Sequence, residues 1–448
     1  MYLRLVSQIF LLLTVTLVQA QSKLHGLGLH DEKMIDAYFI SRLANYAVED
    51  SLVQATMATK IRQAGVMELR KAVWALWKSA NFRLDSLPSP SIAVVKQSEY
   101  PLHQWELINE ANLPFYYIEK GNTKGAKTAL FLNLHGSGPK EAELKVTLAW
   151  SLRYRDSPSR YFIPQIPNER YYRWWLRPKQ LAWERLLRLA MMDDGIDPNR
   201  IYIIGISEGG YGSQRLGAFY ADYFAGAGPM AGGEPLKNAP PINYRHTPFS
   251  FQTGENDTVF GRNQLTIEAK KAYDSLEKLY PGDYVHKIEL QPGKGHRIDY
   301  TPTTPWLSQY QRKVNPAQVS WVWFPMDGRY RKGFYNVAID QSPLDTIKGI
   351  IYDRAEFHMD IDSSTNTILL KAKLLNSDMT LRTPARKGSI FIYLNDHLVD
   401  LSKRVRVVYN GKEVYNRKAP LSLSTLVESC ALFADPYRLY PAKLRIAL

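Results

Sequence analysis

The chain has 448 residues, 45% hydrophobic and 22% charged. This composition excludes a wholly disordered or fibrous protein, and a chain this long usually folds around more than one core. Lys and Arg outnumber Asp and Glu by 57 to 43, which gives a net charge of +14. Because these charges are spread along the chain, we expect no nucleic-acid partner, although the excess suits an anionic surface.

The first twenty residues have the pattern of a signal peptide. Arg4 precedes an apolar run over 9–18, and Ala20 is followed by the polar Gln21. The run is shorter than the ~20 residues that a membrane-spanning helix needs. We therefore expect removal of residues 1–20 and export to the periplasm or the extracellular space.

A helical N-terminal extension is predicted for residues 21–90. Apolar residues recur at helical spacing between 31 and 81, which indicates two or three amphipathic helices. Pro88 and Pro90 lie in the segment 85–91, where they disfavour continued helix. This segment is predicted to be a linker.

Residues 91–320 show strands alternating with helices, the pattern of an α/β domain with a mainly parallel sheet and helices on both faces. The run 201–206 lacks polar alternation, as expected for a strand that is covered on both sides. The expected strands are 113–118, 129–134, 161–166, 201–206, 248–252 and 286–290, and the expected helices are 179–192, 263–279 and one after Ser207.

Beyond Val322 the helical pattern stops and short alternating runs follow, so residues 321–448 are predicted to form a β-sandwich with its own core. Asn410-Gly411 suits a type I′ hairpin turn. The expected strands are 347–351, 355–361, 367–372, 389–394 and 405–409.

The motif Gly205-Ile206-Ser207-Glu208-Gly209 follows one of the predicted buried strands directly and precedes a helix. Such a sharp turn exposes the serine, and the flanking glycines leave room where side chains would clash. We predict Ser207 to be a nucleophile. The backbone N–H of Glu208 would then point toward a developing oxyanion at the positive end of the helix.

A second backbone donor is expected in the loop Leu134-His135-Gly136-Ser137, which follows the strand 129–134. Small residues here let an N–H of Gly136 or Ser137 approach a substrate carbonyl. His135 is expected to pack within this loop rather than to act as a base. Glu208 is expected to pair its side chain with a nearby Arg or Lys.

Candidates for the acid and the base follow later strands. The strand 248–252 runs into a loop with two carboxylates, Glu255 and Asp257. His296 lies in a glycine-rich loop just after the strand 286–290. Catalytic groups of open α/β sheets gather at the carboxyl ends of strands, which favours His296 over His286 at a strand's start. His358 and His397 belong to the predicted sandwich.

The segment from about Leu113 to Trp306 resembles the α/β-hydrolase superfamily, through the Ser207 motif and the order Ser, Asp, His along the chain. The run Asp197-Pro198-Asn199-Arg200 before the nucleophile strand is similar to exported esterases and to relatives of prolyl oligopeptidase and dienelactone hydrolase. This resemblance implies that Asp257, three residues after Gly254, is the acid. Glu255 would be a neighbouring carboxylate without contact to the base.

The sequence therefore predicts a serine hydrolase with Ser207, Asp257 and His296, acting on a small-molecule or glycan ester. Two alternatives stay open: a peptidase or amidase of the prolyl oligopeptidase type, and a non-catalytic protein that binds carbohydrate or a surface. The run Tyr171–Pro178 mixes aromatic residues with arginines, which suits either packing or a binding pocket. No metal-binding or phosphate-binding motif is present, so no metal and no cofactor are expected.

Overall fold

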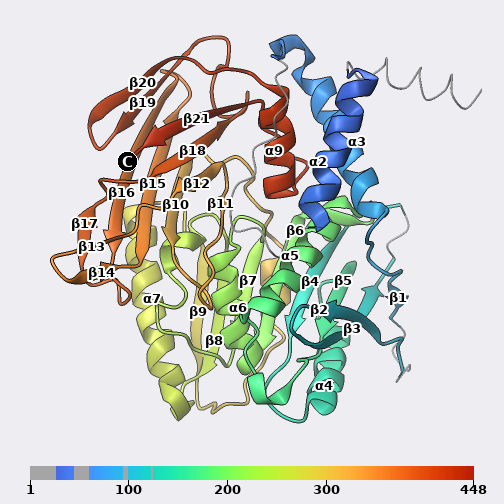
Figure 1. Ribbon diagram of the computed structural model, residues 1–448. Helices are drawn as coiled ribbons and strands as arrows, with labels where there is room; N and C mark the ends of the chain where they lie inside the picture. Colours follow the sequence, from blue (N-terminus) through green and yellow to red (C-terminus); the bar gives the residue numbers. More distant parts are fainter. Residues whose placement is uncertain (1–26, 45–59, 94–98, 123–124) are drawn as a thin grey trace, which may run out of the picture.

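The computed structural model describes residues 27–44, 60–93, 99–122 and 125–448. The predicted signal peptide lies outside these residues. Figure 1 shows three parts: helices from the N-terminal segment, a central sheet flanked by helices, and further sheets from the C-terminal segment. Within the described residues, no helix has the length and apolar character needed to cross a membrane.

The N-terminal helices are α2 (Leu29–Ala44) and α3 (Val66–Phe82), with the short 3₁₀ turn η1 (Gln63–Gly65) before α3. Phe39 of α2 meets Trp77 of α3 edge to face, with ring centroids 4.9 Å apart. The segment after α3 is not helical, as the prolines predict. Asp85 anchors it, because both of its carboxylate oxygens accept hydrogen bonds from Arg185 at 2.6 Å.

The central sheet has the order β1-β3-β5-β4-β6-β7-β8-β9, with β2 paired to β3. β3 runs antiparallel to β2 and β5, whereas the pairs from β5 through β9 are parallel. The strands are β1 (Ser91–Ile92), β2 (His103–Leu107), β3 (Glu110–Lys120), β4 (Thr128–Leu134), β5 (Ser159–Pro164), β6 (Ile196–Ile206), β7 (Gly226–Met230), β8 (Phe249–Gly254) and β9 (His286–Gln291).

Both faces of this sheet are covered by helices. Alternate residues of a strand point to opposite faces. Leu130 and Leu132 of β4 belong to one apolar cluster with α5 and α6, while Phe131 belongs to another with α4 and α8. The helices are α4 (Lys140–Arg153), α5 (Arg177–Met192), α6 (Glu208–Phe219), α7 (Arg262–Leu279) and α8 (Thr303–Leu307), joined by the 3₁₀ turns η2 (Glu169–Tyr171), η3 (Pro241–Tyr244) and η4 (Val259–Gly261).

The C-terminal segment forms two facing sheets, of order β10-β15-β16-β19-β20 with β17 paired to β16, and β11-β12-β18-β21. Trp321 of β10 stacks on Phe334 of β11 across the gap, with centroids 5.4 Å apart. The elements are β10 (Gln318–Trp323), β11 (Gly333–Phe334), β12 (Val337–Gln341), β13 (Asp345–Ile347), β14 (Ile350–Tyr352), β15 (Arg354–Asp362), β16 (Thr367–Leu375), β17 (Arg382–Pro384), β18 (Ser389–Leu394), β19 (Arg404–Tyr409), β20 (Lys412–Lys418), α9 (Leu423–Phe433) and β21 (Ala442–Ala447).

The structure corrects two predictions in the C-terminal segment. The expected strand 347–351 is a hairpin, because Lys348 and Gly349 both have positive φ, at 50° and 80°, and form its turn. Helical structure does not stop at Val322, since α9 follows β20. α9 is buried on most sides, so it lacks the amphipathic period that marks a surface helix. Asn410 and Gly411 form the predicted turn, with φ of 46° and 87°.

The segments also share contacts. The expected boundary between 320 and 321 falls inside β10. Leu426 and Val427 of α9 lie in the same apolar cluster as Phe39 and Trp77 of the N-terminal helices. Figure 1 likewise shows α9 beside α2 and α3. The C-terminal segment is therefore packed against the rest of the chain through one continuous core.

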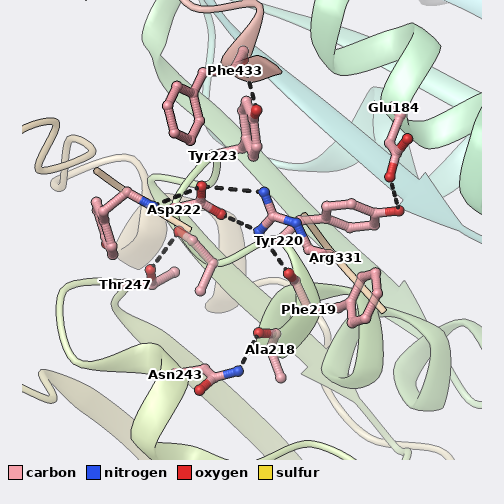
Figure 2. A network of polar contacts seen from close by, with 12 residues as sticks. Glu184, Ala218, Phe219, Tyr220, Asp222, Tyr223, Asn243, Thr247, Arg331 and Phe433 are labelled. Atoms are coloured by element: carbon pink, nitrogen blue, oxygen red, sulfur yellow. Dashed lines mark hydrogen bonds and ion pairs between the residues drawn. The ribbon is translucent and has the colours of Figure 1, made fainter. Parts of the chain in front are cut away.

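A buried polar network ties the end of α6 to the C-terminal segment (Figure 2). Asp222 accepts hydrogen bonds from both Arg331 and Arg438, and Arg331 also donates to the Phe219 carbonyl at 2.8 Å. Burial acts to raise the pKa of Asp222, but the two guanidinium groups hold it below its ordinary value. Since α6 begins at the predicted nucleophile, the network fixes the far end of that helix.

Candidate active site

Ser207 occupies a strained turn between β6 and α6. Its φ of 57° and ψ of −114° lie in a region that non-glycine residues rarely adopt. A Cβ on Gly205 would collide with the Gly209 carbonyl, and one on Gly209 with that of Leu134. The glycine spacing in the sequence is therefore required by close backbone contact, as the motif predicts.

His296 bridges the two other predicted residues. Its Nε2 lies 3.0 Å from Ser207 Oγ, and its Nδ1 lies 2.7 Å from Asp257 Oδ2. A carboxylate only accepts hydrogen bonds, so Nδ1–H donates to Asp257 and Nε2 is left to accept from the serine hydroxyl. The Asp257 side chain is 1% exposed, whereas that of His296 is 42% exposed. The structure thus brings together the three side chains chosen from the sequence.

Arg262 holds the second oxygen of Asp257, with Nη1 3.0 Å from Oδ1. The Nε of the same arginine donates to the Tyr211 hydroxyl at 3.0 Å. A buried carboxylate needs such partners. Sequence reasoning did not identify Arg262, although its position five residues after Asp257, at the start of α7, was the available signal.

Glu255 contacts the backbone of the loop that carries His296. It accepts a hydrogen bond from the backbone N–H of Gly293 at 2.8 Å. The neighbouring Asn256 N–H donates to the Lys294 carbonyl, also at 2.8 Å. The acid and base loops are therefore joined by backbone contacts, while the Glu255 side chain reaches the loop of His296 and not its ring.

The predicted oxyanion loop lies against the nucleophile. A Cβ on Gly136 would sit 3.4 Å from the Ser207 Cβ and 3.1 Å from Glu143 Oε2. Burial raises the pKa of Glu143, and the hydrogen bond from the Gly136 backbone acts in the opposite direction. Because Glu143 accepts a hydrogen bond from the Gly136 backbone, Ser137 and Glu208 remain the candidates for backbone donors to an oxyanion. Sequence reasoning missed Glu143, which reaches the loop from α4.

His135 packs within this loop, as predicted. It is fully buried, and burial lowers its pKa to about 4. Its Nδ1–H donates to the Gly136 carbonyl at 2.6 Å, and its Nε2 accepts from the Ile166 N–H at 2.9 Å. Both ring nitrogens are therefore engaged. His286 and His358 lie on strands and pair with Asp274 and Glu356.

The side chain of Glu208 pairs with Arg173, as predicted, at 3.1 Å. Burial nevertheless raises its pKa to about 7. In the unfolded chain this carboxyl ionises near its ordinary pKa of ~4.3, so folding opposes its ionisation.

Glu208→Gln should therefore stabilise the protein at pH 8 relative to the parent, because the variant carries no buried carboxyl to ionise. The raised pKa makes stability fall between about pH 4.5 and 7 in the parent, and this fall should be smaller in the variant. Thermal unfolding at pH 4.5 and pH 8 checks this. An equal difference in Tm at both pH values would contradict it.

Two cavities open beside Ser207, of about 470 and 490 Å³. Tyr172, Arg173 and Trp175 line the first, while Trp174 is fully buried. The aromatic run thus serves both packing and the cavity wall. Trp150 and Tyr300 line the second cavity. The described residues include no cluster of His, Cys, Asp and Glu that could hold a metal ion.

The sheet order, the strained serine turn after β6 and the chain order Ser, Asp, His define an α/β-hydrolase fold. This confirms the fold expected from the sequence. No family model matches the chain. It is 44% identical over 184 residues to poly(3-hydroxyalkanoate) depolymerase C of Paucimonas lemoignei, a match that covers 38% of this chain and 44% of the relative. The chain thus spans under half of that relative's length.

Solved structures with similarity include a thermostable esterase, with 20% identity, a TM-score of 0.36 and coverage of 47% of this chain and 63% of the esterase. A ferulic acid esterase matches at 14% identity with a TM-score of 0.35, over 47% of this chain and 98% of its own. An acylaminoacyl peptidase matches at 17% identity with a TM-score of 0.32, over 46% of this chain and 39% of the peptidase.

Proposed function

We propose that this protein is an exported serine hydrolase that cleaves a carboxylic ester by acyl transfer. The observation that carries the proposal is the position of His296, within hydrogen-bond reach of both Ser207 and Asp257. A nucleophile, a base and an orienting acid in contact are the arrangement that activates a serine hydroxyl. Export rests on the signal-peptide pattern of residues 1–20.

In the proposed mechanism His296 Nε2 removes the Ser207 proton as Oγ attacks the ester carbonyl. Asp257 holds the imidazole tautomer and stabilises the imidazolium. The backbone N–H groups of Glu208 and Ser137 stabilise the tetrahedral oxyanion. His296 then protonates the leaving alcohol, and a water activated by the same histidine releases the acid.

An ester substrate is favoured by the relative with 44% identity, whose name describes a depolymerase of poly(3-hydroxyalkanoate), a polyester. Both cavities beside Ser207 mix polar and aromatic side chains, which suits an organic ester. Linear 3-hydroxyalkanoate oligomers are therefore the first substrates to test.

The proposal is tested with the purified mature protein on three substrates: 4-nitrophenyl butyrate, the 3-hydroxybutyrate trimer, and an aminoacyl 4-nitroanilide. Labelling by a fluorophosphonate probe is measured in parallel. We expect labelling, hydrolysis of an ester, and at least ~100-fold lower kcat/KM on the anilide, a difference of about 2.7 kcal/mol in the barrier. A faster anilide reaction would favour the peptidase alternative, and no labelling would favour a non-catalytic binding protein.

A further inference from the structure

Ser207 lies where two cavities meet. It lines both of them, and Ser137 is the one other lining residue that they share. A carbonyl attacked by Ser207 therefore has open space on either side. A substrate that fills this space extends in both directions from the scissile bond, as an inner ester linkage of a chain does and a short ester does not.

Phe260 lines the first cavity, with an exposed aromatic ring and an unfavourable backbone conformation. The residue is 79% exposed. Its φ of 58° and ψ of 17° place it in the left-handed region, which is uncommon for a bulky residue. Neither burial nor backbone preference accounts for a phenyl ring here. Such a combination beside a reactive group indicates a role in ligand contact.

The ring of Phe260 is also held in a defined position. The Arg262 guanidinium lies 5.1 Å from its centroid, and Arg262 is itself fixed by Asp257. Val259, which precedes Phe260, and Tyr171, which precedes the cavity-lining Tyr172, are also exposed. The cavity wall includes Trp175 and Leu265 besides Phe260.

We propose that Phe260 is a substrate-binding residue that contacts the apolar chain of a linear ester extending from Ser207 through the first cavity. This deepens the proposed function and rests on it. A small ester such as 4-nitrophenyl acetate would occupy the space around Ser207 without reaching the rim. Phe260 then determines preference for chain length and leaves the chemical step unchanged.

The test compares Phe260→Gly with the parent on 4-nitrophenyl acetate, 4-nitrophenyl octanoate and the 3-hydroxybutyrate trimer. Glycine accepts the left-handed conformation, so Tm should not fall. We expect KM for the trimer to rise about tenfold, because the loss of one aromatic contact weakens binding by about that factor. Both kcat and KM for the acetate should stay within about twofold. The variant removes only a contact to the distant part of a long substrate, which the acetate does not have.

Three further variants separate a contact from a structural effect. Phe260→Tyr keeps the ring and should restore the parent KM for the trimer. Phe260→Asn also suits the left-handed backbone and should behave like glycine. Phe82→Ala removes an exposed phenylalanine at the end of α3 and is the matched control.

The outcomes distinguish the two proposals. If no ester is cleaved, the proposed function fails and this one with it. If esters are cleaved but Phe260→Gly shifts KM for neither the trimer nor the octanoate, Phe260 is no substrate contact and the ester hydrolase stands. Equal losses on acetate and on the longer esters would also overturn the inference, because they indicate disturbance of Asp257 or Arg262.

Discussion

Ser207→Ala is expected to lower kcat/KM by ~10⁴-fold or more and to abolish fluorophosphonate labelling. The variant removes the hydroxyl that lies 3.0 Å from His296 Nε2, while Asp257 keeps its bond to Nδ1. The remaining rate reflects the backbone donors and substrate binding alone. The measurement is kcat/KM on the ester that the parent cleaves best.

The fold should survive this change, because the strained φ of 57° is set by the turn and alanine adopts it no less readily than serine. Tm should therefore shift little. Ser275→Ala on α7, whose hydroxyl donates to the Lys271 carbonyl, is the matched control and should keep full activity. A Ser207→Ala protein within tenfold of the parent would show that another nucleophile acts.

The parts of the site that could be predicted from the sequence are those fixed by contacts between residues close in sequence or by the order of the strands. The turn at Ser207 was predictable, because Gly205 and Gly209 are required by contacts within a few residues of sequence and one adjacent strand. Asp257 and His296 follow strands of the same parallel sheet, and the carboxyl ends of such strands share one edge. Topology thus brings them together without any knowledge of side-chain packing.

The missed residues act across elements. Arg262 and Glu143 reach the site from helices whose rotation about their axes decides which side chain points inward. A sequence gives that rotation only through an apolar stripe, and α4 mixes Leu144 and Leu148 with several charged residues. Phe260 is visible as an anomaly only once its backbone conformation is known.

The fold class is confirmed, but individual strands were missed where the local preference of the residues and their burial disagree. β7 (Gly226–Met230) contains no β-branched residue and lies fully buried between β6 and β8, so neither propensity nor alternation marks it. The hairpin at Lys348 and Gly349 interrupts a run of isoleucines that otherwise predicts one strand.

Asp257→Asn should cost ~10⁴-fold in kcat/KM. The amide can donate to His296 Nδ1, which favours the tautomer with its proton on Nε2, and that nitrogen then cannot accept from Ser207. The variant also removes the charge that stabilises the imidazolium. Arg262 loses its ion partner in a buried position, so a fall in Tm should accompany the loss.

Glu255→Gln is the matched control two residues away. Its amide oxygen can still accept a hydrogen bond from the Gly293 N–H, so the loop that carries His296 should keep its position. We expect kcat/KM to fall by no more than about tenfold, which is the effect of one modest hydrogen bond.

Both variants are assayed on one ester, and Tm is recorded for each so that a loss of folded protein is not mistaken for a loss of catalysis. If Glu255→Gln loses most of its kcat/KM while Asp257→Asn stays nearly normal, the acid is misassigned. If both variants hydrolyse the ester nearly normally, the contact between Asp257 and His296 is not what activates Ser207.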